Sequence, residues 1–527
     1  MDTHSPERRR WIRGSLAAVA LFAPMPYAWV WAQSEGALRL VRLPKVALVI
    51  GNSAYARVPA LVNPGNDARG LAETLKASGF AVDLRLDVTQ ADMAAAIDAY
   101  AKTLAERKCV GLFYFAGHGL QLDWHNYLVP IDAAIARVED IPARAINVST
   151  LIGGIKRAAN PMNVLILDAC RENPFASQAR LEQKGLSQMD APSGTLLAYA
   201  TAPGNLAADG AGANGLYTEN LLREMRVPEA KIEDVFKRVR LGVRLASRGR
   251  QIPWESTSLE EDFYFNPPEQ LKKLSREQED RLFAEERELY EQARASRQAP
   301  SLQQYLVRYP SGRFAELAQL QLDGILAAQG EKRVEIAPSQ GNPHTAGSAR
   351  ADTRFKVGDR YVYRVFDRLR DRELPDAVQL VTAIREFEVE INEGKMALDL
   401  LGNLLQHPNG MRMTSRQDMP AEFVVGKRWT TRYDVVGGPV AAQGTMDLSY
   451  RIAARDKVTV PAGTFDCFRF EGLGYNSSPF RAPSEIRYTY WRSPGVRRPV
   501  AWDQSTRAAG GALVVDLRYE LKEYREG

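Results

Sequence analysis

The sequence predicts an α/β domain with a mostly parallel sheet and helices on both faces, then a short helical segment and a C-terminal all-β domain. Three observations predict this order. Over residues 41–266, short apolar runs of strand length alternate with segments of helical periodicity. Residues 269–327 are charge-rich and helical in pattern, whereas residues 353–527 show strands and turns at regular spacing. With 527 residues, the chain is too long for a single hydrophobic core.

Residues 1–32 resemble an export signal. Arginines at positions 8–10 and 13 precede an uncharged stretch over residues 14–32, which ends in Val-Trp-Ala. These are the basic, apolar and small-residue parts of a secretory signal, and the paired arginines also resemble a twin-arginine signal. The alternative is a membrane anchor, although Pro24 and Pro26 interrupt the stretch. In either case we expect export to the periplasm or cell envelope, with membrane contact only through an uncleaved N-terminus.

The composition argues against several classes of function. The net charge of +5 comes from 69 basic and 64 acidic residues spread along the chain, so we expect no nucleic-acid binding. No glycine-rich phosphate loop follows a predicted strand, and five His and three Cys show no zinc spacing. We therefore expect no metal and no cofactor. The cysteines form no disulfide framework, and Cys109 and Cys467 are expected to be buried packing residues.

The α/β domain is predicted element by element from apolar runs and helix boundaries. Strands are expected at residues 46–50, 82–86, 109–115, 163–168 and 195–200, and helices up to 78 and at 90–104, 148–158, 217–225 and 232–247. Asn66 or Asp67 is expected to cap the first helix, and Thr89 to begin the second. Strands that alternate with helices in this way are typical of a parallel sheet.

Three segments follow the α/β domain. Residues 269–327 predict a helical hairpin that resembles a tetratricopeptide-type half-repeat, too short for a solenoid. We expect it to act as a support or spacer, with binding of a protein partner as the alternative. Residues 328–352, rich in Gly, Ser, Ala and Pro, predict a linker. In residues 353–527, glycine turns feed alternating strands at spacings typical of sandwiches or barrels, with aromatics expected mainly in the core.

Two of the predicted strands lead directly to reactive side chains. His118 follows the run at 109–115, and Cys170 follows the run at 163–168. Functional groups gather outside the carboxyl ends of parallel strands, so both residues are expected at the same edge of the sheet. A thiol attacks as the thiolate, and a nearby imidazole generates one at neutral pH. The sequence therefore predicts a cysteine nucleophile with a histidine base.

The sequence resembles the caspase superfamily, which comprises caspases, metacaspases and bacterial orthocaspases, over about residues 45–265. Four motifs carry the resemblance: Tyr-Phe-Ala-Gly-His-Gly at 114–119, Asn-Tyr-Leu-Val-Pro-Ile-Asp at 126–132, Leu-Asp-Ala-Cys-Arg at 167–171 and Gln-Ile-Pro-Trp-Glu-Ser at 251–256. The histidine and the cysteine are 170 − 118 = 52 positions apart, near the roughly fifty expected of caspases. The caspase Gln-Ala-Cys-Arg-Gly signature is altered here to Asp-Ala-Cys-Arg-Glu.

The resemblance implies a cysteine endopeptidase of the metacaspase type, acting on a peptide or protein substrate. It implies that His118 and Cys170 are catalytic, and that the backbone N–H groups of Gly119 and Cys170 form the oxyanion hole. Metacaspases line the P1 pocket with acidic residues, and Asp67 and Asp168 stand at the matching positions, which implies cleavage after Arg or Lys. Asp67 can instead, or in addition, cap a helix.

The sequence departs from the metacaspase pattern at two points. The pocket hydroxyl expected two residues before the histidine is replaced by Ala116. Metacaspases are often calcium-dependent, but no Asp/Glu run has the spacing of a calcium loop, so calcium dependence cannot be carried over. Asp132 is interpreted either as a partner of His118 or of a metal, or as a buried structural carboxylate, and His125 is predicted at the surface.

Two further questions follow from the resemblance. In the family, the large and small subunits separate within the segment between residues 175 and 193, so self-cleavage after Arg180 or Lys184 is a hypothesis. The alternatives to a peptidase are a catalytically silent scaffold of the same fold, and an envelope-binding protein acting through its C-terminal domains.

Overall fold

The computed structural model describes residues 36–170, 173–177, 179, 181, 185–202, 205, 212–268, 276–332, 342–439, 443–478 and 481–527. Cys170 and Arg276 are described through their backbone alone. The predicted export signal at 1–32 and the candidate self-cleavage residues Arg180 and Lys184 lie outside the described residues. Within the described part of the chain, no helix is both long enough and apolar enough to cross a membrane.

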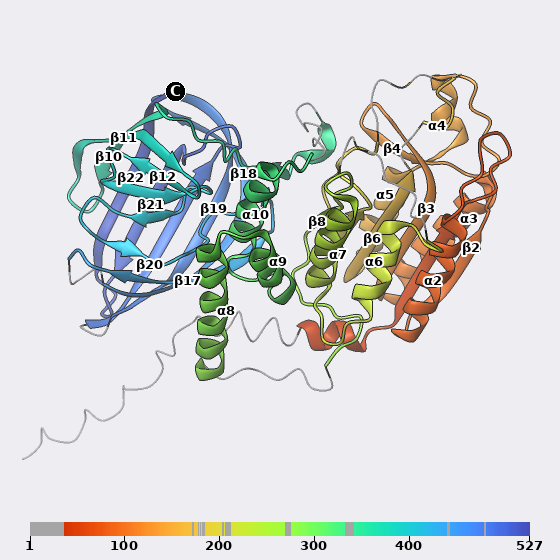
Figure 1. The fold of residues 1–527 in the computed structure, drawn as a ribbon, viewed down its shortest axis with the longest axis horizontal. Helices are drawn as coiled ribbons and strands as arrows, with labels where there is room; N and C mark the ends of the chain where they lie inside the picture. Colours follow the sequence, from red (N-terminus) through yellow and green to blue (C-terminus); the bar gives the residue numbers. More distant parts are fainter. Residues whose placement is uncertain are drawn as a thin grey trace, which may run out of the picture.

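The predicted fold class is confirmed. An α/β unit and a C-terminal β-barrel lie at opposite ends of the molecule, with three helices between them (Figure 1). The sheet of the α/β unit has the strand order β2-β1-β3-β6-β7-β8. These strands are β1 (Lys45–Gly51), β2 (Ala81–Leu86), β3 (Val110–Leu122), β6 (Met162–Cys170), β7 (Thr195–Tyr199) and β8 (Trp254–Thr257). All neighbouring pairs are parallel except β7 and β8, which are antiparallel.

Helices cover both faces of this sheet. They are α2 (Pro64–Ala77), α3 (Gln90–Arg107), α5 (Val148–Ala158), α6 (Leu216–Met225) and α7 (Ile232–Ser247), with a short α4 (Ile141–Arg144) and a 3-10 turn, η1 (Val138–Asp140). One core cluster joins the sheet to α2, α6 and α7, and a second joins it to α3 and α5. Tyr114 and Ile166 face the first cluster, whereas Phe115 and Leu167 face the second. This alternation explains why β3 and β6 are continuous apolar runs: both of their faces are buried.

One predicted helix start is wrong and one is confirmed. Helix α2 begins at Pro64, and Asn63 precedes it, so neither Asn66 nor Asp67 is its cap. Proline is favoured in the first turn because its missing N–H is not needed there and its φ suits a helix. Asp67 lies inside α2 and is therefore available for contacts to other parts of the chain. Thr89 does cap α3, accepting a hydrogen bond from Asp92 N.

The helical segment has three helices where the sequence predicts a hairpin. These are α8 (Arg276–Ser296), α9 (Ala299–Arg308) and α10 (Ala315–Ala328). Tyr290 stacks on Phe314 with ring centroids 4.7 Å apart, in a core that also includes Leu401 and Met419 of the barrel. The segment therefore packs directly against the barrel.

Twelve antiparallel strands close the barrel. They are β10 (Arg360–Asp367), β11 (Arg372–Arg385), β12 (Glu388–Ile391), β13 (Met396–Asp399), β14 (Leu404–Gln406), β15 (Arg412–Met413), β17 (Arg428–Val436), β18 (Gly444–Val460), β19 (Gly463–Ser478), β20 (Arg481–Arg492), β21 (Ala501–Arg507) and β22 (Leu513–Arg525). Gly358 and Gly426 precede β10 and β17 at φ of +97° and +96°, a conformation that favours glycine. They are the predicted glycine turns that lead into strands.

Residues 342–352 form structure where the sequence predicts only linker, and are called the connecting segment below. The segment contains a 3-10 turn, η2 (Pro343–Thr345), and a strand, β9 (Ser348–Arg350), which pairs with β16 (Glu422–Val424). On its other side it contacts the loop at 187–190. Asp190 N donates to His344 O at 2.8 Å, and the Asp190 carboxylate accepts from Gly347 N at 2.6 Å and from Ser348 Oγ. The segment thus ties the loop that follows β6 to the barrel.

Replacing Asp190 with alanine should loosen the connecting segment. The change removes two hydrogen bonds to a carboxylate, each typically worth about 1.5–3 kcal/mol, so hydrogen exchange at residues 345–350 should accelerate by at least roughly 10-fold even if only one bond is lost in effect, and by about 100-fold or more if both are. Asp83→Ala is the matched control, because Asp83 forms an exposed pair with Arg85 and should leave this exchange unchanged. Equal exchange rates in wild type and Asp190→Ala would show that the connecting segment is held by other contacts.

Candidate active site

His118 and Cys170 are direct neighbours across two parallel strands. The register of β3 and β6 runs without interruption from Val110 opposite Met162 to His118 opposite Cys170. Paired residues in neighbouring strands lie about 4.8 Å apart in the hydrogen-bonding direction. The structure therefore brings the two predicted catalytic positions together at the backbone level, on the same edge of the sheet.

The sequence predicts that His118 follows the end of its strand, but in the structure the strand continues past it. β3 continues to Leu122 and forms a hairpin with β4 (His125–Leu128), which in turn pairs with β5 (Ile146–Asn147). His118 is the last residue of β3 to pair with β6, and Gly119 is the first to pair with β4. His118 is therefore the point at which β3 leaves the parallel sheet. Residues 119–122 remain in strand conformation but pair with β4 instead of β6.

The residue before the histidine must be glycine. Gly117 has a φ of +155°, and a Cβ there would lie 2.6 Å from Tyr55 Oη and 2.9 Å from the Phe115 ring. Gly119 is restricted by packing, because a Cβ would lie 2.8 Å from Ala169 Cβ, next to Cys170. The two glycines of the motif therefore allow β3 to approach β6 and Tyr55 closely at the position of His118.

Tyr55 holds the backbone of His118. His118 N donates to Tyr55 Oη at 2.8 Å, and His118 O accepts from Val129 N at 3.0 Å. The Tyr55 ring also packs on the imidazole, with centroids 4.6 Å apart, and His118 is only 6% exposed. Sequence reasoning missed this tyrosine, although its position just beyond β1, on the same edge of the sheet, was a usable signal.

The two acidic residues predicted for the P1 pocket both act electrostatically on the Tyr114 phenol, and Asp168 also accepts a hydrogen bond from it. Asp168 Oδ2 accepts from Thr218 Oγ1 at 2.7 Å and from Tyr114 Oη at 3.3 Å. Burial raises the pKa of the Tyr114 phenol well above its ordinary value, and the charges of Asp168 and Asp67 raise it further. Both carboxylates are therefore close enough to Tyr114 to act on it, although they come from α2 and β6.

The start of α6 supplies hydrogen bonds to both carboxylates. Asp67 Oδ1 accepts from Asn214 Nδ2 at 2.8 Å and from Gly215 N at 3.0 Å, while Thr218 binds Asp168. The N-terminal end of a helix favours negative charge, so α6 stabilises this acidic pair. Ala116 pairs with Asp168 across the strands and lacks the hydroxyl expected in the pocket. Thr218 provides a hydroxyl at Asp168 instead. Sequence reasoning missed both Tyr114 and Thr218 as pocket residues. Thr218 is 50 positions from Asp168 in the chain, so no local pattern connects the two.

Other candidate residues have structural roles. Asp132 Oδ1 accepts from Gln90 N at 2.9 Å, at the start of α3, which is a structural contact, but the residue is exposed and not buried as the structural interpretation expected. His125 is not a plain surface residue, because its ring packs edge-on against His344 with centroids 4.9 Å apart. Cys109 and Cys467 are free thiols in the cores of their domains, as predicted. Among the described residues, no group of three or more His, Cys, Asp or Glu side chains is arranged to hold a metal ion.

Comparisons with known proteins match the part of the chain that holds this site. Residues 44–264 match the family model described as Caspase domain. The chain is also 28% identical over 235 residues to the mucosa-associated lymphoid tissue lymphoma translocation protein 1 homolog of Mus musculus, and 34% identical over 131 residues to the corresponding protein of Homo sapiens. These matches cover 43% and 24% of this chain, and 27% and 15% of the lengths of the two relatives.

Proposed function

Because residues 44–264 carry a caspase-family peptidase domain, we propose that this protein is a cysteine endopeptidase of the metacaspase type with a His118/Cys170 dyad. The observation that carries the proposal is the backbone register, which pairs these two residues at the last position shared by β3 and β6. The contacts of Tyr55 support it, because they fix the backbone and the ring environment of His118.

In the proposed reaction, His118 takes the proton of the Cys170 thiol, and the thiolate attacks the carbonyl carbon of the scissile peptide bond. Backbone N–H groups of Gly119 and Cys170 stabilise the oxyanion that forms. His118 then protonates the leaving amine as the intermediate collapses to a thioester. Water hydrolyses the thioester, with His118 accepting its proton, and the free thiol is restored.

The acidic pair supports a preference for Arg or Lys at P1. Asp67 accepts hydrogen bonds from the residues just before α6, and Asp168 accepts them from Thr218 of α6 and from Tyr114, so their positions are fixed before a substrate binds. A substrate guanidinium could form charge-assisted hydrogen bonds with carboxylates held in this way, whereas an acidic P1 side chain would be repelled.

A panel of fluorogenic peptides with Arg, Lys or Asp at P1 tests the proposal on the full-length protein. We expect cleavage after Arg and Lys. Cleavage after Asp would contradict the acidic pocket, and cleavage of none of the peptides would favour the catalytically silent scaffold.

We also propose export to the periplasm or cell envelope. The basic start and the uncharged stretch of residues 1–32 support this proposal, and cell fractionation tests it.

A further inference from the structure

Two arginines are buried inside the barrel at the end of β20 and in the loop that follows it. Arg492 is 1% exposed and Arg498 is 9% exposed. The guanidinium of Arg498 donates from Nε to Gln379 Oε1 at 3.0 Å and from Nη1 to Gly402 O at 2.8 Å. Arg492 donates from Nη2 to Arg497 O at 3.1 Å, while its Nε and Nη1 have no hydrogen-bond partner among the described residues.

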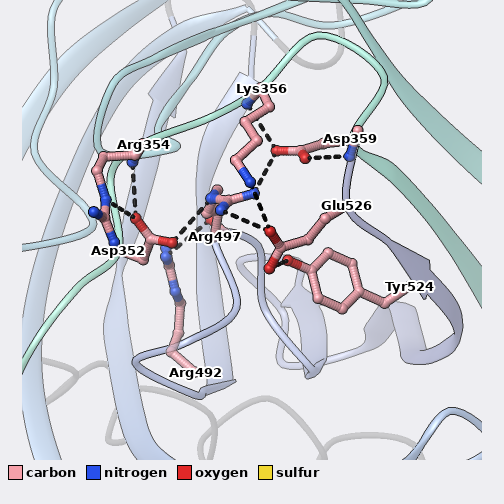
Figure 2. A network of polar contacts seen from close by, with 9 residues as sticks. Asp352, Arg354, Lys356, Asp359, Arg492, Arg497, Tyr524 and Glu526 are labelled. Atoms are coloured by element: carbon pink, nitrogen blue, oxygen red, sulfur yellow. Dashed lines mark hydrogen bonds and ion pairs between the residues drawn. The ribbon is translucent and has the colours of Figure 1, made fainter.

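A third arginine in the same loop shows the usual way to bury this group. Arg497 forms ion pairs with Asp352 at 3.0 Å, Asp359 at 2.8 Å and Glu526 at 3.4 Å. Figure 2 shows these carboxylates around Arg497, with Arg492 beside the network. In the described part of the chain, no ion pair joins a carboxylate to Arg492 or to Arg498.

The buried carboxylate of Asp399 acts on Arg492 through its charge but forms no ion pair with it in the described structure. Asp399 Oδ1 accepts from the backbone N–H groups of Leu401 and Asn403, and its Oδ2 accepts from Asn403 Nδ2 at 2.8 Å. Burial raises the pKa of Asp399 to about 6, so the group is still mostly ionised at neutral pH, but its charge reaches Arg492 without a direct ion pair in the described structure. Burial also lowers the pKa of Arg492 to about 10, with repulsion from Arg498 as a second cause. A buried cation without a counter-charge is costly, and natural sites compensate it with an anion.

The donors of the two arginines converge on one small space. A Cβ built on Gly402 would lie nearest to Arg497 O, at 3.5 Å, then 3.6 Å from Arg498 Nη1 and 3.7 Å from Arg492 Nη1. The absence of a side chain at Gly402 therefore leaves this space lined by two guanidinium groups. Tyr361 Oη, also buried, has no hydrogen-bond partner in the described structure, and Tyr361 interacts electrostatically with both arginines.

We propose that the barrel binds a small oxyanion, a carboxylate or phosphate group, between Arg492 and Arg498 beside Gly402. Such a group accepts hydrogen bonds from several guanidinium N–H donors at once and supplies a negative charge in direct contact with them, which no carboxylate of the described residues does. The Phe423 ring lies against the Arg492 guanidinium, with 5.8 Å between the ring centroid and the guanidinium carbon. The proposal is independent of the peptidase activity, because it concerns the barrel alone.

The test is calorimetric titration of the full-length protein with phosphate, sulfate or acetate at constant ionic strength. Wild type should bind one oxyanion per chain. Arg492→Met, which replaces the charge by an apolar side chain of similar length, should bind it at least about tenfold more weakly, as expected for loss of a charged hydrogen-bond donor. Arg487→Met is the matched control, because Arg487 is exposed on the same strand and pairs with Glu485.

The arms of the titration separate the two sources of the anion. Saturable binding of acetate alone assigns a carboxylate ligand, and binding of phosphate and sulfate alone assigns a phosphoryl group. Arg492→Lys keeps the charge but loses the planar donor set, and it should weaken binding even if the methionine variant does not fold. Absence of saturable binding to wild type, or equal binding by wild type and the foldable Arg492 variants, would overturn the proposal.

Discussion

Replacing Cys170 with alanine is expected to lower kcat/KM for an Arg-P1 peptide by at least about 10³-fold, because the nucleophile of the reaction is removed. His118→Ala should lower it to a similar extent, since two groups that act as one unit are not additive. The measurement is initial-rate hydrolysis of a fluorogenic peptide by the full-length protein, with folding checked by circular dichroism.

Cys467→Ala is the matched control for this result. Cys467 is a buried thiol in the barrel, and burial together with Asp466 and Asp456 raises its pKa to about 12, so it is not a nucleophile at neutral pH. Its replacement should leave kcat/KM unchanged. Retained hydrolysis by Cys170→Ala would show that the activity comes from another residue.

Replacing Asp168 with asparagine is expected to lower kcat/KM for an Arg-P1 peptide by roughly 10- to 100-fold, because a charged hydrogen-bond partner of the substrate becomes neutral. Asparagine keeps an oxygen that can accept from Thr218 Oγ1 and Tyr114 Oη, so the geometry of the pocket should persist. The decrease in kcat/KM should therefore come from the lost attraction to the positive charge of the P1 side chain.

A peptide with citrulline at P1 separates charge from shape, since citrulline is a neutral analogue of arginine. The ratio of kcat/KM for arginine over citrulline should fall in Asp168→Asn and remain unchanged in Asp83→Asn, where an exposed pair with Arg85 is altered. An unchanged ratio in Asp168→Asn would place the P1 side chain elsewhere.

Local patterns in the sequence were sufficient for most of the α/β unit. Helix α3 was predicted from Thr89 and from apolar positions that are indeed buried, such as Met93 and Ile97, because these signals lie within one helix. The pairing of His118 with Cys170 followed from a general rule about parallel strands. Where the signal lay within one helix or strand, the prediction held except at the start of α2.

Contacts between distant parts of the chain could not be predicted in this way. Thr218 reaches Asp168 only because the start of α6 lies against the sheet, and His344 reaches His125 only through the folded connecting segment. Closure of the barrel likewise depends on β10 pairing with β22, more than a hundred residues away. The spacing of strands shows that an all-β domain exists but does not specify which strands pair.

The misassigned start of α2 has a different cause. Asparagine and aspartate at 66 and 67 were weighed as caps, while the preference of Pro64 for the first helical turn was overlooked. The correction strengthens the interpretation of the pocket. The Asp67 carboxylate is not used as a helix cap and instead accepts hydrogen bonds from Asn214 and Gly215, beside Tyr114.

Covalent labelling tests the central claim most directly. The native protein is incubated with a peptidyl-arginine chloromethyl ketone, digested, and the modified cysteine is identified by mass spectrometry. The account predicts a single label on Cys170, because Cys109 and Cys467 are buried and burial raises the pKa of both thiols. An unmodified Cys170, or a label on either buried cysteine, would contradict it.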